Sequence, residues 1–221
     1  MKKVRIILAL LICFTTIFSF DFIPAAAAAT LQYGSSGPEV VQLQKQLASL
    51  GFYLGPTGID GRFGPYTLEA LQGVQSASGL PIDGVVGDAT RDQIAFWSSQ
   101  PAFSPYLQTD HFAPWEFKCR HCGSLGRGMS KALLLRLEAL YVKLGSVPIW
   151  VTSGYRCPVH NSRLSGAAAN SQHMYNTAAD IQVSVAPAAV ANAAETIFGD
   201  GGLGRYSSFT HVDVRGYHAR W

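Results

Sequence analysis

The stretch "SQHMYNTAADI", residues 171–181, places one histidine, His173, seven residues before one aspartate, Asp180. Seven residues along a single strand would put the two side chains on opposite faces. The letters "YNTAADIQVSV" instead predict a turn that enters a strand, with His173 before the turn and Asp180 at the start of the strand. The small Ala178 and Ala179 let the two segments approach closely, which a shared metal ion requires.

A third candidate ligand lies in "FTHVDV", residues 209–214. His211 and Asp213 are two residues apart on a predicted strand, so their side chains share a face. His211 could complete a His–Asp–His set with His173 and Asp180, leaving the fourth position open for water, as catalytic zinc sites do. The ordinary alternatives are a buried histidine hydrogen-bonded in the core and an aspartate that ends a turn. The residues alone leave both interpretations open.

The region around these residues, 109–221, mixes helical and strand patterns. A helix is predicted to begin after Ser130, a good N-cap, and to end at Gly145. The other predicted elements are strands at "PIWVTSGY" (148–155), "AADIQVSV" (178–185) and "FTHVDVRG" (209–216), and a helix from Pro187 to Gly199. This order predicts an α+β domain with a short antiparallel sheet.

Residues 30–95 contain an internal repeat. "DGRFGPYT" (60–67) and "DGVVGDAT" (83–90) both read D-G-x-[FV]-G-x-x-T, with a period of 23 residues. The Asp-Gly pairs suit tight turns, and each threonine lies at the start of a helical pattern. "PEVVQLQKQLASLG" (38–51) adds apolar residues at helical spacing. We predict a small three-helix domain, followed by a linker at 96–108 that is rich in Ser and Pro.

The first 29 residues predict a secretory signal peptide. Lys2, Lys3 and Arg5 precede an apolar run, and five alanines end at Ala29, where cleavage is expected. The run is too short to span a membrane, so we expect a secreted monomer without a membrane anchor. Removing the segment lowers the formal charge of +3 to about +1, and such a chain lacks the basic patch that nucleic-acid binding needs.

Three cysteines remain after the signal peptide: Cys119, Cys122 and Cys157. Export favours a disulfide, but an odd number leaves one thiol over or indicates a metal. The letters "CRHC" and "CPVH", which ends at His160, could together form a structural zinc site. We prefer the disulfide because the protein is expected to be exported, and the sequence leaves both possibilities open.

The N-terminal pattern resembles the peptidoglycan-binding domain found at the ends of many wall hydrolases. The matching pieces are "GSSGPEVVQLQKQL" (34–47), "LGFY" (50–53) and the two repeats, about 60 residues together. Val74 stands where that family usually has an aromatic residue. The resemblance implies peptidoglycan as a partner, whereas the plainer alternative is a helical spacer whose repeats only build turns.

The second half closely resembles the M15 zinc peptidases, which include D-Ala-D-Ala carboxypeptidases and murein endopeptidases. The resemblance covers about 110 residues and rests on "SGYRCPVHNSRLSGAAANSQHMYNTAADI" (153–181) and "GRYSSFTHVDVRG" (204–216). It implies Zn²⁺ as the cofactor, with three ligands: His173, Asp180 and His211.

The same resemblance gives a role to Arg156, in the S-G-Y-R match, which would hold the substrate near the scissile bond. The alternative for Arg156 is a structural ion pair. One departure from the family pattern is Asn176, which stands in place of a glycine between the first two ligands. Asparagine is the residue that next best tolerates positive φ, so we expect the turn to survive.

A second departure concerns the catalytic acid/base. Many family members carry it two or three residues before the last histidine, where this chain has Phe209 and Ser208, which cannot take a proton. Asp213, two residues after that histidine, is the substitute that strand geometry allows, so we predict it as the catalytic base. His160 and His218 are weaker candidates.

These observations predict an exported zinc peptidase, associated with the cell wall, that hydrolyses peptide bonds of peptidoglycan stem peptides. It would be a D-Ala-D-Ala carboxypeptidase or a murein endopeptidase held on the wall by its N-terminal domain. One rival is a dipeptidase for free D-Ala-D-Ala, which export disfavours. Another is a non-catalytic wall-binding protein with a degenerate peptidase fold, which the missing acid/base favours. The sequence leaves open which bond is cut.

Overall fold

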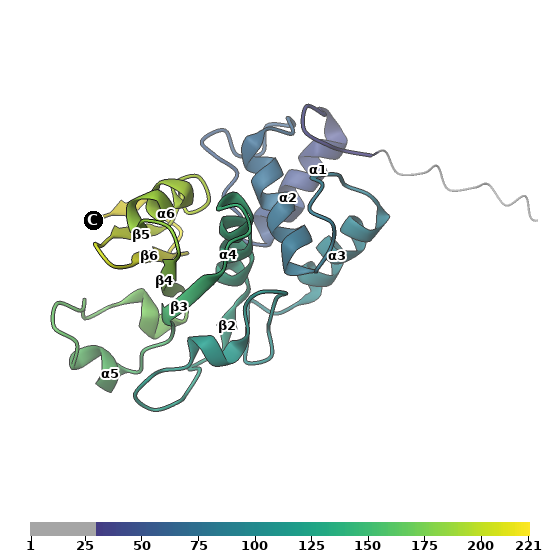
Figure 1. The fold of residues 1–221 in the computed structure, drawn as a ribbon. Helices are drawn as coiled ribbons and strands as arrows, with labels where there is room; N and C mark the ends of the chain where they lie inside the picture. The colour runs from purple at the N-terminus through teal and green to yellow at the C-terminus, as the bar shows by residue number, and fades with distance from the viewer. Residues whose placement is uncertain (1–29) are drawn as a thin grey trace, which may run out of the picture.

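The computed structural model describes residues 30–221, and the predicted signal peptide lies outside the described residues. The described chain forms a helical part and a sheet-containing part, with helix α4 between them (Figure 1). Between residues 30 and 221, no helix has both the length and the apolar character needed to cross a membrane.

The N-terminal part contains the three predicted helices, which are α1 (Pro38–Ser49), α2 (Pro65–Ala77) and α3 (Asp88–Ser99). Proline opens α1 and α2 at the first turn, where its missing N–H costs no hydrogen bond. The residues that gave the helical spacing in the sequence are buried, among them Val40, Leu43 and Leu47. The prediction of a three-helix domain is confirmed.

The two repeats have a structural role that the sequence did not reveal. Each repeat wraps around a buried glutamine from a preceding helix. Gln44 donates to Asp60 Oδ1 at 2.9 Å and to Thr67 Oγ1 at 3.2 Å, and its own Oε1 accepts from Gly61 N at 2.8 Å. Gln75 makes the same set of hydrogen bonds in the second repeat, to Asp83, Thr90 and Gly84. The repeated letters therefore satisfy two buried amides.

The predicted linker at 96–108 includes the end of a helix and a short strand. Helix α3 continues to Ser99, because Trp97 is buried in the domain and donates to Ser78 Oγ at 3.0 Å. Strand β1 (Phe103–Ser104) then pairs with β2 (Met129–Ser130) in a two-stranded antiparallel sheet. Serine and proline in this segment indicated a loop, but the buried Trp97 and Leu107 anchor it near its two ends.

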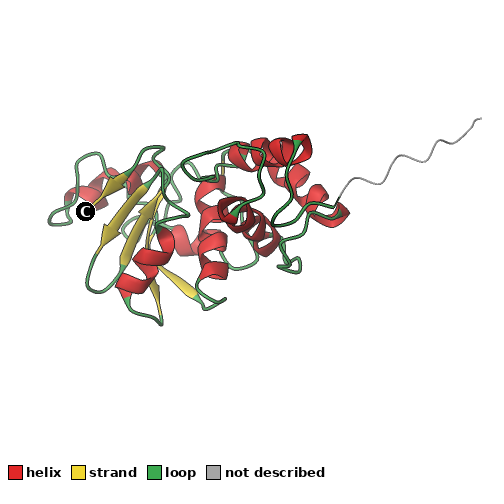
Figure 2. Cartoon of the chain, turned by 90° about the horizontal axis from the view of Figure 1, so that it is seen from above, coloured by secondary structure: helices red, strands yellow, loops and turns green. Residues whose placement is uncertain are grey.

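The C-terminal part is built on a five-stranded sheet in the order β3-β4-β6-β5-β7, and Figure 2 shows its strands in yellow on the side away from the N-terminal helices. Its strands are β3 (Ile149–Ser153), β4 (Ala178–Val183), β5 (Gly202–Arg205), β6 (Thr210–Asp213) and β7 (Ala219–Arg220). All neighbouring pairs are antiparallel except β5 and β7, which are parallel. The predicted α+β fold with a short antiparallel sheet is confirmed.

The helices of this part are α4 (Lys131–Lys143), α5 (Pro158–Ser162) and α6 (Pro187–Ala194), with 3₁₀ turns η1 (Pro114–Phe117) and η2 (Gln172–Tyr175). Ser130 caps α4 as predicted, since its side chain accepts from Leu133 N at 3.3 Å. Helix α6 ends at Ala194 and not at Gly199, because both Ile197 N and Phe198 N bond to the carbonyl of Ala194 in a closing turn.

Helix α4 is buried on both sides because the three-helix domain packs directly against it (Figures 1 and 2). Glu138 on α4 is fully buried and accepts from Ser76 Oγ at 2.5 Å. Arg136 donates to the carbonyl of Gly51 at 2.6 Å. One apolar core runs through both parts, so the N-terminal domain is docked on the second part and is not a module on a loose tether.

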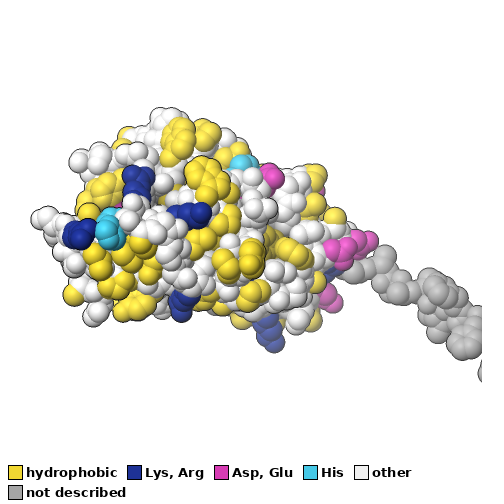
Figure 3. Space-filling model, turned by 90° about the horizontal axis from the view of Figure 1, so that it is seen from below, with side chains coloured by type: hydrophobic (Ala, Val, Ile, Leu, Met, Phe, Trp, Pro, Cys, Tyr) yellow, Lys and Arg dark blue, Asp and Glu magenta, His cyan; other side chains and the backbone are white. Residues whose placement is uncertain are grey.

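Figure 3 shows the distribution of side-chain types on one face of the molecule. On the face shown in Figure 3, lysine and arginine side chains lie apart from one another among apolar and uncharged groups. Thirteen large apolar side chains are exposed over the described chain, including Tyr206 and Trp221. Both of these lie beside the candidate site.

Candidate metal centre

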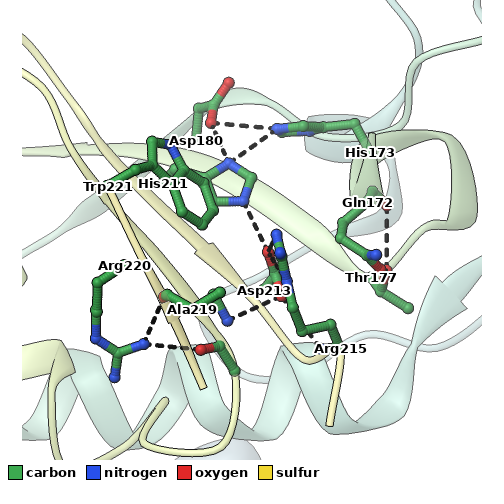
Figure 4. Close-up of polar contacts among 12 residues, drawn as sticks. Gln172, His173, Thr177, Asp180, His211, Asp213, Arg215, Ala219, Arg220 and Trp221 are labelled. Atoms are coloured by element: carbon green, nitrogen blue, oxygen red, sulfur yellow. Dashed lines mark hydrogen bonds and ion pairs between the residues drawn. The ribbon is translucent and has the colours of Figure 1, made fainter. Parts of the chain in front are cut away.

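Three side chains from separate segments converge on one point, as the sequence predicted (Figure 4). His173 Nε2 lies 3.2 Å from Asp180 Oδ1 and 3.2 Å from His211 Nδ1. Asp180 Oδ1 and His211 Nδ1 are 2.9 Å apart. All three residues are buried, with His173 only 1% exposed.

Local structure explains how the three side chains meet. Asp180 on β4 and His211 on β6 are direct partners across the antiparallel ladder, so their side chains lie on the same face. His173 sits in η2, which ends at Asn176 with φ 59° and ψ 24°. The expectation that asparagine adopts the left-handed conformation here is confirmed, and the turn brings His173 back over the start of β4.

Two hydrogen bonds set the tautomers of the two neutral imidazole rings. His173 Nδ1 lies 2.7 Å from the carbonyl oxygen of Gly154, which can only accept, so Nδ1 is the donor. His211 Nε2 lies 3.0 Å from Asp213 Oδ2 and donates to that carboxylate. His173 Nε2 and His211 Nδ1 are therefore left with lone pairs, and both face Asp180 Oδ1.

This donor set fits a zinc ion. Tetrahedral zinc with ligands at about 2.0–2.1 Å separates its ligand atoms by about 3.3 Å, and the three observed separations are 2.9–3.2 Å. A proton on His211 Nδ1 could form a hydrogen bond in only one of these three contacts. A divalent cation between the three atoms would interact favourably with all of them. A backbone carbonyl or carboxylate behind each metal-binding histidine is also the usual arrangement.

Burial and charge set the protonation of the three groups. Burial is the largest influence on His173 and lowers its pKa, which favours the neutral ring that binds metals. Burial also opposes charge on His211, but its hydrogen bonds to Asp180 and Asp213 prevail and raise its pKa. Burial acts to raise the pKa of Asp180, yet the bonds to both histidines hold that pKa well below its usual range.

Asp213 does not occupy the place that the general-base prediction requires. It shares a face with His211 as predicted, but it lies behind the ring, on the side away from Asp180 (Figure 4). Its side chain is fully buried, and its two oxygens also accept from Gly202 N, Arg215 N, Arg215 Nε and Arg215 Nη2 at 2.5–3.1 Å. A carboxylate held by five donors has no free oxygen to offer a water molecule.

Arg156 lies beside the centre and forms an ion pair with the outer oxygen of Asp180. Its Nε donates to Ser153 Oγ at 2.8 Å, and its backbone N donates to the carbonyl of His173 at 3.2 Å. Arg156 Nη1 has no hydrogen-bond partner among residues 30–221. The side chain therefore supports Asp180 and still presents N–H groups to the space in front of it.

That space is a cavity of about 690 Å³. Besides the three converging residues, its walls contain two arginines, three aromatic side chains, and residues of η2 and the loop before it. These residues include Arg156, Arg215, Tyr206, Phe209, Trp221, Leu164, Ser165, Gly166, Asn170 and Gln172. Neither His160 nor His218 lines it. His160 lies beside Cys119, and His218 Nδ1 donates to the carbonyl of Gly199 at 3.0 Å.

Sequence reasoning missed Arg215, Tyr206 and Trp221. Trp221 lies over the His211 ring with centroids 5.1 Å apart and donates to the Tyr206 hydroxyl at 2.8 Å. Arg215 neutralises Asp213 and borders the cavity. Asp213 and Arg215 are two residues apart, a spacing that could have indicated a pair on one face of a strand. Nothing in the sequence places Trp221 over His211.

The three cysteines form a separate cluster. None is in a disulfide, and their sulfurs lie within 4.8 Å of one another. Burial acts to raise the pKa of Cys119, but hydrogen bonds from the backbone of Cys157, Cys122 and His121 and from the His160 side chain bring it down to about 6. The predicted disulfide is absent from the described structure.

Comparison with known proteins agrees with both halves of this architecture. Residues 110–213 match the family model of peptidase M15, and residues 36–94 match that of a peptidoglycan binding domain. The fold and the converging triad thus define a metallopeptidase-type domain joined to a peptidoglycan-binding-type domain. The C-terminal domain, over residues 110–213, is thus similar to the M15 peptidases.

Individual relatives extend over one or both parts. The chain is 36% identical over 165 residues to the zinc D-Ala-D-Ala carboxypeptidase of Streptomyces albus G, an alignment that covers 69% of this chain and 60% of that protein. It is 42% identical over 64 residues to a spore cortex-lytic enzyme of Bacillus cereus, covering 29% of this chain and 24% of that protein. It is 38% identical over 65 residues to an N-acetylmuramoyl-L-alanine amidase of Bacillus licheniformis, covering 29% and 18%. The chain therefore spans at most about three fifths of these relatives.

Proposed function

We propose that this protein is a zinc peptidase that hydrolyses peptide bonds in the stem peptides of peptidoglycan. The convergence of His173 Nε2, Asp180 Oδ1 and His211 Nδ1 within 3.2 Å of one another carries this proposal. The match of residues 110–213 to the peptidase M15 family model and the similarity to a zinc D-Ala-D-Ala carboxypeptidase support the substrate class.

In this proposal, His173, Asp180 and His211 hold the ion. Bound zinc supplies a Lewis acid that lowers the pKa of water and polarises a peptide carbonyl. The chain's part is to orient both imidazoles, so that the ring nitrogen facing the ion can offer its lone pair. Gly154 does this for His173 through its carbonyl, and Asp213 does it for His211 through its carboxylate. Asp213 is thus a positioning residue, in place of the general base predicted from the sequence.

The charge around the cavity supports a substrate that ends in a carboxylate. Arg156 and Arg215 both line the cavity, and no carboxylate other than Asp180 does so among residues 30–221. Guanidinium groups bind carboxylates through paired N–H donors. Arg156 is proposed to bind the substrate with the N–H groups that Asp180 and Ser153 leave free.

The aromatic side of the cavity is proposed to hold the peptide chain. Tyr206 and Phe209 stack with ring centroids 4.2 Å apart, and Trp221 continues this wall to the His211 ring. Such a wall excludes water and packs against small apolar residues such as alanine. Phe209, which stands where relatives can carry an acid/base, then contributes surface and not proton transfer.

The N-terminal domain is proposed to bind the wall and to hold the exported protein on its substrate. Asp60, Thr67, Asp83 and Thr90 of the repeats are committed to buried glutamines, so they are not the binding groups. A shallow pocket of about 380 Å³ lies next to the first repeat and is lined by Tyr33, Gly34, Ser35, Ser36, Arg62, Phe63 and Gly64. This pocket is the proposed wall contact.

A non-catalytic wall-binding protein is the second candidate. The observation that favours it is the composition of the cavity walls, where the described residues supply neither a histidine nor a carboxylate outside the triad. A peptidase of this design must rely on the metal and on Arg156 more than on a separate proton acceptor. Turnover therefore separates the two candidates.

The deciding experiment digests purified peptidoglycan with the full chain and analyses the products by mass spectrometry, with and without a chelator. Loss of terminal alanine indicates a carboxypeptidase, and loss of cross-links indicates an endopeptidase. A matched pair of stem peptides, one ending in a free carboxylate and one amidated, tests the role of the arginines. No product from either substrate, with zinc fully bound, would support the non-catalytic candidate.

A further inference from the structure

A second cluster of potential ligands lies outside the catalytic cavity. Cys119 and Cys122 come from the loop after η1, and Cys157 and His160 come from the start of α5. The three sulfurs lie within 4.8 Å of one another, and His160 Nδ1 is 3.5 Å from Cys119 Sγ. Two segments about 40 residues apart in the chain thus present four groups of the kind that bind soft or borderline metal ions.

We propose that Cys119, Cys122, Cys157 and His160 bind a structural zinc ion. The sequence spacing is C-x-x-C followed by C-x-x-H, which is typical of closed Cys₃His sites. In tetrahedral zinc coordination, with Zn–S about 2.3 Å and Zn–N about 2.0–2.1 Å, sulfur and nitrogen lie about 3.6 Å apart. The observed 3.5 Å between Cys119 Sγ and His160 Nδ1 matches this value.

The backbone around the cluster is arranged as in metal-binding turns. Cys119 N donates to Ser124 O and Gly123 N donates to Cys119 O, both at 2.8 Å, so the chain reverses between the first two cysteines and Ser124. Gly123 makes this possible with φ +69°. Cys157 N donates to Cys119 Sγ at 3.4 Å, and such N–H donors favour the thiolate that a metal needs.

A disulfide would account for fewer of these side chains than a metal ion does. It would join two sulfurs and leave the third sulfur and His160 without a role. A zinc ion can bind all three sulfurs, and His160 is the candidate fourth ligand, since its Nδ1 lies 3.5 Å from Cys119 Sγ and its backbone N donates to Cys157 Sγ at 3.4 Å. The cluster therefore favours the ion over the disulfide predicted from the expected export.

The ion would fasten the segment that supports the catalytic ligand. Tyr155 N donates to Phe117 O at 2.8 Å, and a Cβ on Gly154 would lie only 2.5 Å from Phe117 Cα. The carbonyl of the same Gly154 accepts from His173 Nδ1. Cys119 follows Phe117 closely in the chain, and Cys157 follows Tyr155. An ion bound by these cysteines would hold the two segments together and so keep the Gly154 carbonyl in place for His173.

The test measures zinc per chain by elemental analysis of the full protein, with thiol alkylation under denaturing conditions beside it. We expect the wild type to hold a zinc ion that is lost in Cys122→Ser and in His160→Ala, and we expect alkylation of Cys119, Cys122 and Cys157 without prior reduction. His121→Ala, in the same turn, should keep the ion. His173→Ala should also keep it, which distinguishes this site from the catalytic one. Cys122 is exposed, so its replacement leaves no cavity, and circular dichroism checks the fold.

Cobalt substitution adds a spectroscopic readout. Cobalt bound to thiolates gives a charge-transfer absorption that imidazole and carboxylate ligands do not give. This absorption should be present in His173→Ala and absent in Cys122→Ser. The proposal is overturned if the wild type lacks the thiolate absorption, if two of Cys119, Cys122 and Cys157 are alkylated only after reduction, or if Cys122→Ser and His160→Ala retain all the zinc of the wild type.

Discussion

His211 and Asp213, two residues apart on β6, are joined by a 3.0 Å hydrogen bond from Nε2 to Oδ2. The bond lies on the side of the imidazole opposite to Asp180, and it leaves Nδ1 free for a metal. Because side chains alternate along a strand, the spacing of two residues places the carboxylate directly beside the ring. Asp213 therefore acts on the metal through His211.

Asp213→Asn should weaken zinc binding by about 10–100-fold, the usual effect of losing a carboxylate behind a metal-binding histidine. The amide must also turn its NH₂ group toward one of the donors of Gly202 or Arg215. Activity should fall in proportion to zinc occupancy and return when excess zinc is added. Metal titration and turnover on the same samples measure both quantities.

The general-base role gives a different result for this variant. It would lower kcat by about 10²–10⁴-fold while zinc stayed bound. Asp110→Asn, at an exposed aspartate away from the cavity, is the matched control and should change neither quantity. A large loss of kcat in fully zinc-loaded Asp213→Asn would restore the original prediction.

Much of the fold could be predicted because its elements carry local signals. Ser130 marks the start of α4 by its capping side chain, and Asn176 marks a left-handed turn, and both are confirmed. Strand β5 gave no such signal, because "GLGR" lacks the alternating or β-branched residues of a strand. Its glycines are required by the site, since a Cβ on Gly202 would lie 2.1 Å from Asp213 Oδ2.

The candidate site was predictable as a set of residues but not as an arrangement. The motif spacing brought His173, Asp180 and His211 together, whereas the role of Asp213 depends on which side of a ring it occupies. Sharing a face with His211 was consistent with either side. Trp221 joins the site through the path of the last strand, which the sequence pattern does not contain.

Asn176 should be better than glycine at its own position. Its Nδ2 donates to Leu125 O at 2.6 Å, and its Oδ1 accepts from Arg127 N at 3.3 Å. Asn176→Gly keeps the left-handed turn but loses these bonds, worth about 1 kcal/mol each. Asn176→Ala loses the bonds and also strains the backbone by about 1–2 kcal/mol. Urea unfolding should rank the chains Asn, then Gly, then Ala, and a more stable Ala variant would contradict this explanation.

The two domains should unfold together. Gly73 on α2 faces α4, and a Cβ there would lie 2.9 Å from Ala139 Cβ and 3.0 Å from Leu135 O. Gly73→Val should therefore destabilise the protein by about 1–3 kcal/mol through overpacking. Gly87→Ala, where an added Cβ meets nothing within 4 Å, is the control. Calorimetry should show a single transition that shifts only for Gly73→Val, and two separate transitions in the wild type would contradict the shared core.

This interface also affects how wall binding is tested. Deleting residues 30–95 would expose the buried face of α4 and leave Glu138 without Ser76. Substitutions in the proposed wall pocket avoid that problem. Tyr33→Ala and Arg62→Ala should reduce pelleting with insoluble peptidoglycan and leave turnover of a soluble stem peptide unchanged. If the variants lose turnover of the soluble stem peptide as strongly as they lose binding to peptidoglycan, the pocket is not a separate wall-binding site.

Zinc affinity should decrease as the solution is acidified from neutral pH. In the metal-free protein, Asp180 and Asp213 raise the pKa of His211 above its ordinary 6.5 despite its burial. At mildly acidic pH the ring therefore carries a proton on both nitrogens and is positively charged. Zinc must displace the proton on Nδ1. Affinity should be pH-independent above the raised pKa and fall by about tenfold per pH unit below it.

A competing chromophoric chelator measures this dependence across the neutral range. Asp213→Asn removes one of the groups that raise the His211 pKa, so the fall should begin at a lower pH in that variant. His218→Ala, whose ring is exposed and outside the cavity, should leave the curve unchanged. An affinity that stays constant below neutral pH would mean that His211 does not bind the ion.

The most direct test of the catalytic zinc centre measures zinc content and stem-peptide turnover on the same preparations of the wild type, His173→Ala, His211→Ala and His218→Ala. Both triad variants should lose one zinc ion per chain together with turnover, and His218→Ala should keep both, because only the triad atoms converge within bonding distance of a shared ion. If His173→Ala and His211→Ala retain the full zinc content of the wild type, or lose zinc and still turn over the peptide, then the ion is not held where His173, Asp180 and His211 meet or is not needed for catalysis.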